Sequence, residues 1–247
     1  MGNCVRVIRQ PREFALVPME TRTNNLNPQD PRAALPDPWE VAYLRFETPE
    51  QEIRKFVSRL RKLGATRWPR NDEVVELFCG RGNGLTALER LGFTHIEGVD
   101  LSPRLIAQYR GPAKCFVGDC RQLPFADRSK DVLIVQGGLH HLPALPDDLE
   151  KTFSEMQRVL RKDGRVVFVE PWLTPFLKFV HAVSENPLAH RLSNKLDALA
   201  TMIHFERPTY EQWLTHPDLI QKLAHAHFSP AHESFEWGKW NFVGHPR

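Results

Sequence analysis

Cysteine is scarce in this chain, and its few copies follow no pattern that binds zinc or forms disulfides. Cys4, Cys79, Cys115 and Cys120 include no Cys-x-x-Cys pair. They are therefore predicted to be reduced thiols in a cytoplasmic protein. Long apolar runs are lacking too: no stretch approaches the roughly 20 residues of a membrane helix, and the start "MGNCVRVIRQ" has no apolar signal region. Neither membrane insertion nor secretion is expected.

A concentration of charge of one sign is also lacking. The 247 residues include 33 lysines and arginines and 30 aspartates and glutamates, for a net charge of +3, with no run of five basic residues. Proteins that bind nucleic acid generally concentrate basic residues on one surface. Charge therefore gives no reason to expect a nucleic-acid partner. Hydrophobic residues make up 41% of the chain, enough for a substantial core.

The N-terminal residues and the first predicted helix differ in pattern. Residues 1–38 are rich in proline, asparagine and arginine and have no sustained period, which predicts an irregular arm. A helix is predicted to start after Thr48, because Thr48 and Gln51 match a capping box and Pro49 stands at the first helical position. We expect it to end at Gly64.

The rest of the chain alternates short β-branched runs with helical stretches, which predicts an α/β fold with a parallel sheet covered on both faces. Residues 39–170 are expected to form this core together with the lead helix. A helical insertion, residues 171–228, is predicted to cap the acceptor site. Residues 229–247 are then expected to form a β-hairpin around Gly238 that completes the sheet.

The stretch "VVELFCGRGNG", residues 74–84, predicts a strand followed by a glycine loop whose backbone lies close to a ligand. A dinucleotide fingerprint would need glycine where Leu85 stands, and a P-loop would need a lysine that "GLT" lacks. Carboxylates are predicted at three strand ends: Glu76 could meet an ammonium group, Asp100 ribose hydroxyls, and Asp119 an adenine amino group. The pattern indicates a nucleoside with a cationic tail, for which the glycines clear space.

Four motifs carry a family resemblance. "ELFCGRGNG", "GVDLS", "GDCRQLPFADRSKDVLIVQGGLHHL" and "LRKDGRVVFVEP" resemble, in order and spacing, the motifs of class I S-adenosylmethionine-dependent methyltransferases, in particular the small-molecule branch of methyltransferase type 11. The likeness covers residues 73–171. It implies a Rossmann-like, seven-stranded, mostly parallel sheet that binds S-adenosylmethionine. By this resemblance the cofactor-binding residues are Glu76, Gly80, Gly82, Asp100, Leu101, Asp119, Cys120 and Gln136.

The sequence near the predicted fourth strand bears on the acceptor. Phe78 stands where many relatives have glycine, and such a stretch also occurs in some nucleic-acid methyltransferases. "VQGGLHHL", however, has neither the Asn-Pro-Pro-aromatic loop nor the Pro-Cys nucleophile of those enzymes. A small acceptor is therefore expected, methylated at an oxygen of a sugar, lipid or quinone-like molecule. The alternatives are an RNA- or protein-modifying methyltransferase and an inactive cofactor-binding scaffold.

Histidines are the candidate catalytic groups, because an acceptor hydroxyl or amine can need its proton removed. His140 and His141 are expected beside the transferred methyl group, with bracing of the loop as their alternative role, and His204 is the candidate from the insertion. Further candidates are Glu170 and His181. No metal site is expected, since the pair His225 and His227 has no third ligand at helical spacing.

Aromatic residues outside the sheet are expected either to line the acceptor pocket or to belong to the core. In the insertion these are Trp172, Phe176, Phe179, Tyr210 and Trp213. Trp39 and Tyr43 are expected to lie over the cofactor as a lid.

Overall fold

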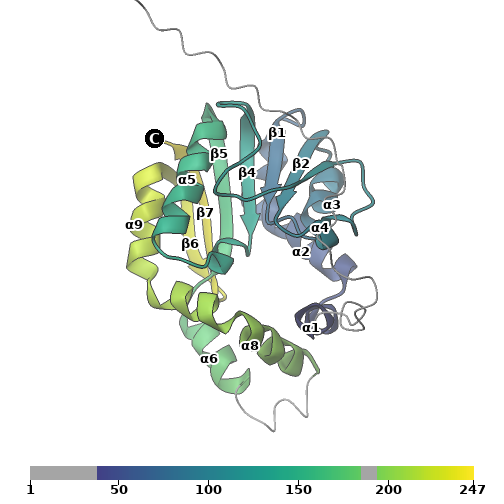
Figure 1. Cartoon of the computed structure of the whole chain (residues 1–247), viewed down its shortest axis with the longest axis vertical. Coiled ribbons are helices and arrows are strands. Elements are labelled where there is room, and N and C mark those ends of the chain that lie inside the picture. Colours follow the sequence, from purple (N-terminus) through teal and green to yellow (C-terminus); the bar gives the residue numbers. More distant parts are fainter. Residues whose placement is uncertain (1–37, 185–193) are drawn as a thin grey trace, which may run out of the picture. The chain divides into compact units, whose positions relative to one another are not determined.

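Seven strands form one sheet in the computed structural model, which describes residues 38–184 and 194–247. The strands follow the order β3-β2-β1-β4-β5-β7-β6 (Figure 1). They are β1 (Glu73–Leu77), β2 (His95–Asp100), β3 (Lys114–Val117), β4 (Lys130–Gln136), β5 (Leu160–Pro171), β6 (Phe228–Glu236) and β7 (Lys239–Pro246). β1 to β5 run parallel, and β7 pairs antiparallel with both β5 and β6. The predicted Rossmann-like, mostly parallel sheet is confirmed, whereas the predicted N-terminal arm falls almost wholly outside the described residues.

Helices surround the sheet. They are α1 (Pro38–Phe46), α2 (Pro49–Lys62), α3 (Asn83–Arg90), α4 (Pro103–Ile106), α5 (Asp147–Val159), α6 (Pro175–Ser184), α8 (Asn194–Thr215) and α9 (Pro217–His227), with the 3₁₀ turns η2 (Ala65–Arg67) and η3 (Leu139–His141). The lead helix starts as predicted: Thr48 and Gln51 form the capping box, and Gly64 follows the helix with φ of 96°. Between β2 and β3 the chain forms only the short helix α4, and beyond it the Tyr109 hydroxyl donates to Glu89 and accepts the Ala113 N–H.

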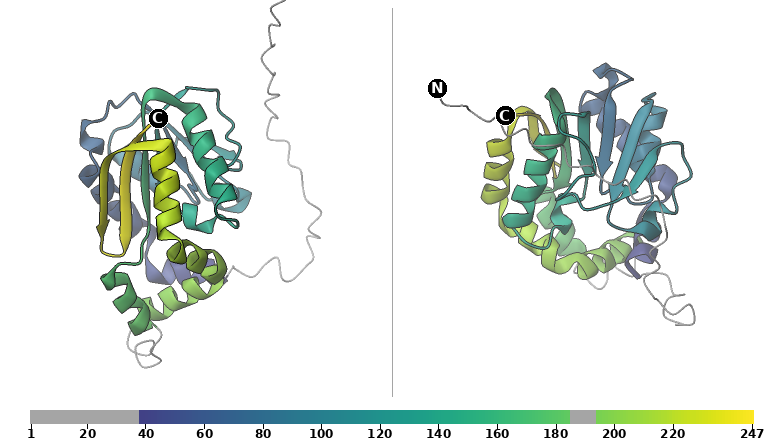
Figure 2. Two further views of the ribbon diagram at one scale, coloured as in Figure 1. Left: turned by 90° about the vertical axis from the view of Figure 1, so that its left-hand side faces the viewer. Right: turned by 45° about the horizontal axis from the view of Figure 1, so that its top comes forward.

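The sheet has a hydrophobic core on each face. Successive side chains of a strand point to opposite faces. In β4, Ile134 packs in the cluster that contains Leu88 of α3, whereas Leu133 packs in the cluster that contains Phe153 of α5. Helices α5 and α9 lie side by side over the second cluster (Figure 2). This two-sided burial explains why the parallel strands are almost continuously apolar.

The helices of the insertion lie at one end of the sheet. Helix α8 contacts α1, α6, α9 and η3, and it runs beyond the carboxyl end of β4 (Figure 1). An ion pair of 3.0 Å between Arg45 of α1 and Asp197 joins α1 to α8. The strand ends, where ligands bind in such sheets, are therefore flanked by helices from both ends of the described chain.

Candidate cofactor and acceptor site

The three glycines that follow β1 differ in what lies next to the position that a side chain would occupy. A Cβ atom on Gly84 would lie 1.8 Å from Oε1 of Glu76, and one on Gly82 would lie 2.3 Å from the ring of Tyr109. A Cβ atom on Gly80, by contrast, would meet nothing within 4 Å. Gly84 and Gly82 thus make room for side chains of the protein itself. Of the three, Gly80 is the one that opens onto free space.

Glu76 is a buried carboxyl group with one oxygen unsatisfied. Its side chain is 3% exposed, and Oε1 accepts a hydrogen bond of 3.1 Å from Nε2 of Gln136. Oε2 has no hydrogen-bond partner among the described residues. Burial raises the pKa of Glu76 to about 8, against the opposing effect of the Gln136 hydrogen bond. A buried, unpaired acceptor is costly, so this oxygen suits a ligand donor such as an ammonium group.

The Asp100 carboxylate braces the glycine loop. Oδ2 accepts the Gly80 N–H at 2.7 Å and Oδ1 accepts the Ser102 N–H at 2.8 Å. Each carboxylate oxygen has a second lone pair, so the group can still accept hydroxyl hydrogens. The neighbouring Leu101 is 70% exposed, which leaves an apolar side chain beside this carboxylate. The end of β2 can therefore offer both polar and apolar contacts to a nucleoside.

Asp119 already has a strong partner, which sequence reasoning missed. Arg121 donates to both of its oxygens, with Nη2 2.6 Å from Oδ2, and also bonds Asp148 at 2.8 Å. The Arg121 guanidinium holds the pKa of Asp119 below its usual value. An adenine amino group would have to share this carboxylate with the guanidinium. Cys120 is buried, and burial raises the pKa of its thiol to about 11, which disfavours a role as a nucleophile.

The lead helices are tied to the glycine loop from outside the sheet. Glu52 of α2 is buried and accepts hydrogen bonds from Asn83 Nδ2 at 2.7 Å and from the Tyr43 hydroxyl. The Arg81 guanidinium lies 4.9 Å from the centre of the Tyr43 ring. Tyr43 thus contacts the loop, as a lid residue would, while the Trp39 side chain lies outside what the structure describes.

Beyond the end of β4, His140 is held by a fully buried carboxylate. Its Nδ1 lies 2.8 Å from Oε2 of Glu170, at the end of β5. The other oxygen of Glu170 accepts the N–H groups of Gly138 and Leu139 at 2.8 and 2.9 Å. Burial alone would raise the pKa of Glu170, but these three donors hold it below its usual range. The imidazole orientation is therefore fixed by a carboxylate that is itself fully bonded.

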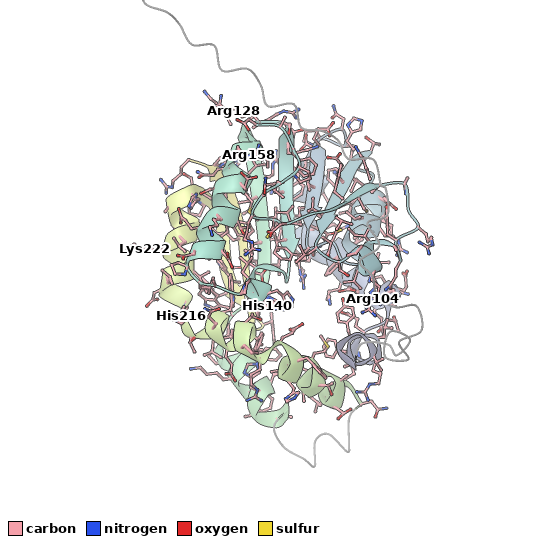
Figure 3. All side chains as sticks on the ribbon, in the orientation of Figure 1. Arg104, Arg128, His140, Arg158, His216 and Lys222 are labelled. Atoms are coloured by element: carbon pink, nitrogen blue, oxygen red, sulfur yellow. The ribbon has the colours of Figure 1, made fainter. Side chains whose placement is uncertain are left out.

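Glu206 of α8 faces both histidines, and the sequence analysis did not select it. Its Oε2 lies 3.8 Å from His140 Nε2 and its Oε1 lies 3.8 Å from His141 Nε2. Figure 3 shows His140 at the end of the sheet, next to α8. Burial would lower the pKa of His140, but Glu170 and Glu206 outweigh it and raise it. Burial and the neighbouring His140 lower the pKa of His141.

The other candidate histidines do not join this group. His204 is exposed on α8, with its ring against Phe205. His181 bonds the Tyr210 hydroxyl at 3.0 Å. His225 and His227 lie 3.0 Å from Glu233 and 2.9 Å from Glu150, respectively. The structure thus assembles His140 and His141 but leaves the third catalytic candidate, His204, outside.

The aromatic residues of the insertion divide between core and surface. Trp213 is 1% exposed and donates its indole N–H to the Pro171 carbonyl at 2.8 Å, and Tyr210 is also buried. Phe176 and Phe179 are exposed. Trp172 is partly buried against Trp240. Some residues expected at the acceptor pocket thus belong to the core.

Phe78 packs between the loop after β1 and the turn after β4. Its φ is 57°, and a Cβ atom on Gly138 would lie 2.3 Å from its ring. Gly138 is therefore the residue that makes room for Phe78. The departure from the usual glycine is accommodated inside the protein.

The comparisons agree with this fold and these motifs. Residues 75–168 match the family model described as a methyltransferase domain. The demethylmenaquinone methyltransferase of Beutenbergia cavernae is 34% identical over 141 residues, which cover 48% of this chain and 55% of that protein. The ubiquinone/menaquinone biosynthesis C-methyltransferase of Geotalea daltonii is 29% identical over 124 residues, covering 45% and 50%. The chain thus spans about half the length of these two relatives.

Solved structures share the fold over most of the chain. A Pyrococcus horikoshii protein has a TM-score of 0.64 at 19% identity, covering 86% of this chain and all of that one. The magnesium protoporphyrin IX methyltransferase of Synechocystis has a TM-score of 0.55 at 16% identity, covering 85% and 94%. The fold and motifs are those of class I S-adenosylmethionine-dependent methyltransferases, and residues 75–168, which match the family model, resemble the type 11 branch of that class.

None of the helices in residues 38–184 and 194–247 has the length and apolar character needed to cross a bilayer.

Proposed function

We propose that this protein transfers a methyl group from S-adenosylmethionine to a small-molecule acceptor, at an oxygen atom. The observation that carries the proposal is the unpartnered buried oxygen of Glu76, beside Gly84, in a segment that matches a methyltransferase domain. A donor with an ammonium group would satisfy that oxygen. We also propose a cytoplasmic location, for which the unpatterned cysteines are the support.

The residues of the strand ends would divide the cofactor between them. Glu76 would accept from the ammonium group, with Gln136 holding the Glu76 carboxyl in place. Asp100 would accept from the ribose hydroxyls, and Leu101 would cover the base. Asp119 and the Cys120 amide would bond the adenine. When bound, the cofactor supplies a methyl carbon that its sulfonium already activates, so the protein contributes mainly alignment and exclusion of water.

The acceptor would meet the group of His140, His141 and Glu206. A hydroxyl loses a proton when it is methylated, and imidazole and carboxylate side chains are the groups that can take it. The exposed Phe176 and Phe179 of α6 and Phe205 of α8 offer apolar surface to a lipid or quinone-like molecule. Relatives named for demethylmenaquinone and for ubiquinone and menaquinone biosynthesis support a quinone-like acceptor, whereas the choice of oxygen differs from the C-methyltransferase named among them.

Calorimetry with S-adenosylmethionine tests the proposal. We expect saturable binding by the natural chain and at least about tenfold weaker binding by Asp100→Ala, since a hydrogen-bonded carboxylate contributes about 1.5–3 kcal/mol. Asp218→Ala, which alters an exposed carboxylate of α9, is the matched control. Asp100→Asn keeps the shape of the side chain and removes its charge. It therefore distinguishes the effect of the charge on binding from the effect of disturbing the glycine loop. Absence of saturable heat, or unchanged affinity in Asp100→Ala, would overturn the assignment.

A further inference from the structure

We propose that His140, His141 and Glu206 form a binding site for one divalent transition-metal ion, of the kind represented by Zn²⁺ and Co²⁺. One ligand atom from each of the three residues lies within 4.8 Å of the others. Two imidazoles and a carboxylate are a donor set that such ions accept, with positions left over for water or substrate. This inference goes beyond the proposed methyl transfer, which needs no metal.

The support behind His140 is what a metal-binding histidine requires. Metal-bound imidazoles commonly donate the second ring N–H to a carboxylate, which fixes the tautomer and aims the other nitrogen. His140 has this arrangement: Nδ1 faces Glu170 at 2.8 Å, and Nε2 is on the side of Glu206. Glu170 is in turn anchored by the backbone N–H groups of Gly138 and Leu139. The ring is thereby oriented before any ligand arrives.

The second histidine and the carboxylate complete the set from two elements. The rings of His140 and His141 are 4.1 Å apart, and each Nε2 lies 3.8 Å from a different oxygen of Glu206. Two ligands about 2.1 Å from one tetrahedral ion lie about 3.4 Å apart. The ligand atoms lie within 4.8 Å of one another, so they need to approach by up to about 1.4 Å, which rotation of the Glu206 side chain on α8 and of the His141 ring can supply.

The position of the proposed metal site indicates which reaction step a bound ion would assist. The histidines lie in η3, a few residues after Gln136 at the end of β4, and the Gln136 amide donates to Glu76. A metal here would lie between η3 and helix α8. A hydroxyl bound to such an ion loses its proton more readily than in water. The ion would therefore prepare an oxygen acceptor.

Titration of untagged, metal-free protein with Co²⁺ tests the inference, because Co²⁺ bound by nitrogen ligands gives visible absorption bands without any methyl acceptor. We expect one saturable equivalent that Zn²⁺ displaces. Glu206→Gln and His141→Ala should each weaken binding at least tenfold. His204→Ala, which changes an exposed histidine of the same helix, should leave binding unchanged.

Glu170→Gln tests the positioning role separately. Loss of a supporting carboxylate typically weakens metal binding by about 10- to 100-fold, so a loss of that size is expected. Two results would overturn the site: no saturable Co²⁺ absorption band in the natural chain, or equal affinity for Co²⁺ in His204→Ala, His141→Ala and Glu206→Gln. The three side chains would then be only a cluster of paired charges. Those outcomes leave the calorimetric binding of S-adenosylmethionine untouched, so the two proposals fail separately.

Discussion

Glu76 and Glu170 are both buried carboxyl groups near the ends of β1 and β5, the two strands that flank β4, yet their protonation is shifted in opposite directions. Glu170 receives two backbone N–H groups and an imidazole, and its pKa is lowered. Glu76 receives one amide hydrogen, and burial raises its pKa to about 8. The number of donors around a buried carboxyl decides its charge. The protein thus completes the Glu170 site itself and leaves Glu76 to be completed by a ligand.

The largest effect on the free energy of unfolding is expected when the Glu170 carboxylate is removed. Glu170→Ala leaves the two N–H groups and His140 without their partner. Removing one member of a buried ion pair costs about 3–5 kcal/mol, so the free energy of unfolding should fall by that amount in urea titrations. Glu211→Ala, at an exposed pair with Arg207, is the control, for which about 0–1 kcal/mol is expected. A loss below about 1 kcal/mol for Glu170→Ala would contradict the account.

A smaller change tests the room that Gly84 leaves for Glu76. Gly84→Ala places a methyl group on the carboxyl oxygen, and overpacking of this kind costs about 1–3 kcal/mol in the free energy of unfolding. The double variant with Glu76→Ala should recover most of that loss, as a double-mutant cycle measured in urea would reveal. If the two losses were simply additive, the contact between Gly84 and Glu76 would not be the cause.

The raised pKa of Glu76 predicts that cofactor binding depends on pH. An ammonium ligand favours the ionised carboxylate, so binding near pH 7 should release about 0.9 proton from a group of pKa about 8. Affinity should rise up to about tenfold per pH unit from pH 6 towards 8. Calorimetry in buffers of different ionisation enthalpy measures the released protons. In Glu76→Gln the side chain does not titrate, so any proton released by this variant comes from the amine of the ligand and can be subtracted. Equal proton release in both proteins would disprove the prediction.

The stability of the free protein should follow the same group. The folded pKa of Glu76 lies above its unfolded value, so the folded state binds the extra proton. This contribution to the free energy of unfolding is fully present below about pH 4.5 and is lost as pH rises through about 8. Glu76→Gln should flatten that part of the pH profile measured by urea unfolding. A natural chain and variant with parallel profiles would speak against the raised pKa.

The smallest expected effect concerns Asp119, which resembles Glu170 in having its own partner. Arg121→Ala frees both carboxylate oxygens for an adenine amino group, so affinity for S-adenosylmethionine should rise, by less than about tenfold. Calorimetry measures the change, and Arg128→Ala, at the opposite end of the sheet, is the control (Figure 3). Weaker binding would show that Arg121 positions Asp119 rather than competing for it.

The places of the candidate cofactor residues in the fold could be predicted because these residues are close in sequence to strand ends. Glu76, Asp100 and Asp119 each stand in or directly after a β-branched run, and parallel strands bring such positions to one edge. The roles of the glycines were less accessible. That Gly82 and Gly84 make room for Tyr109 and Glu76 depends on distances that spacing does not encode.

Local patterns determined the sheet, its lead helix and the positions of the cofactor motifs, since hydrophobic period and caps act over a few residues. The acceptor side was decided by tertiary structure. His140, Glu170 and Glu206 come from η3, β5 and α8, at least thirty residues apart in sequence, and no local pattern distinguishes Glu206 from the other carboxylates of its helix. Their charges depend on burial and on partners across the chain, which exist only once the elements pack.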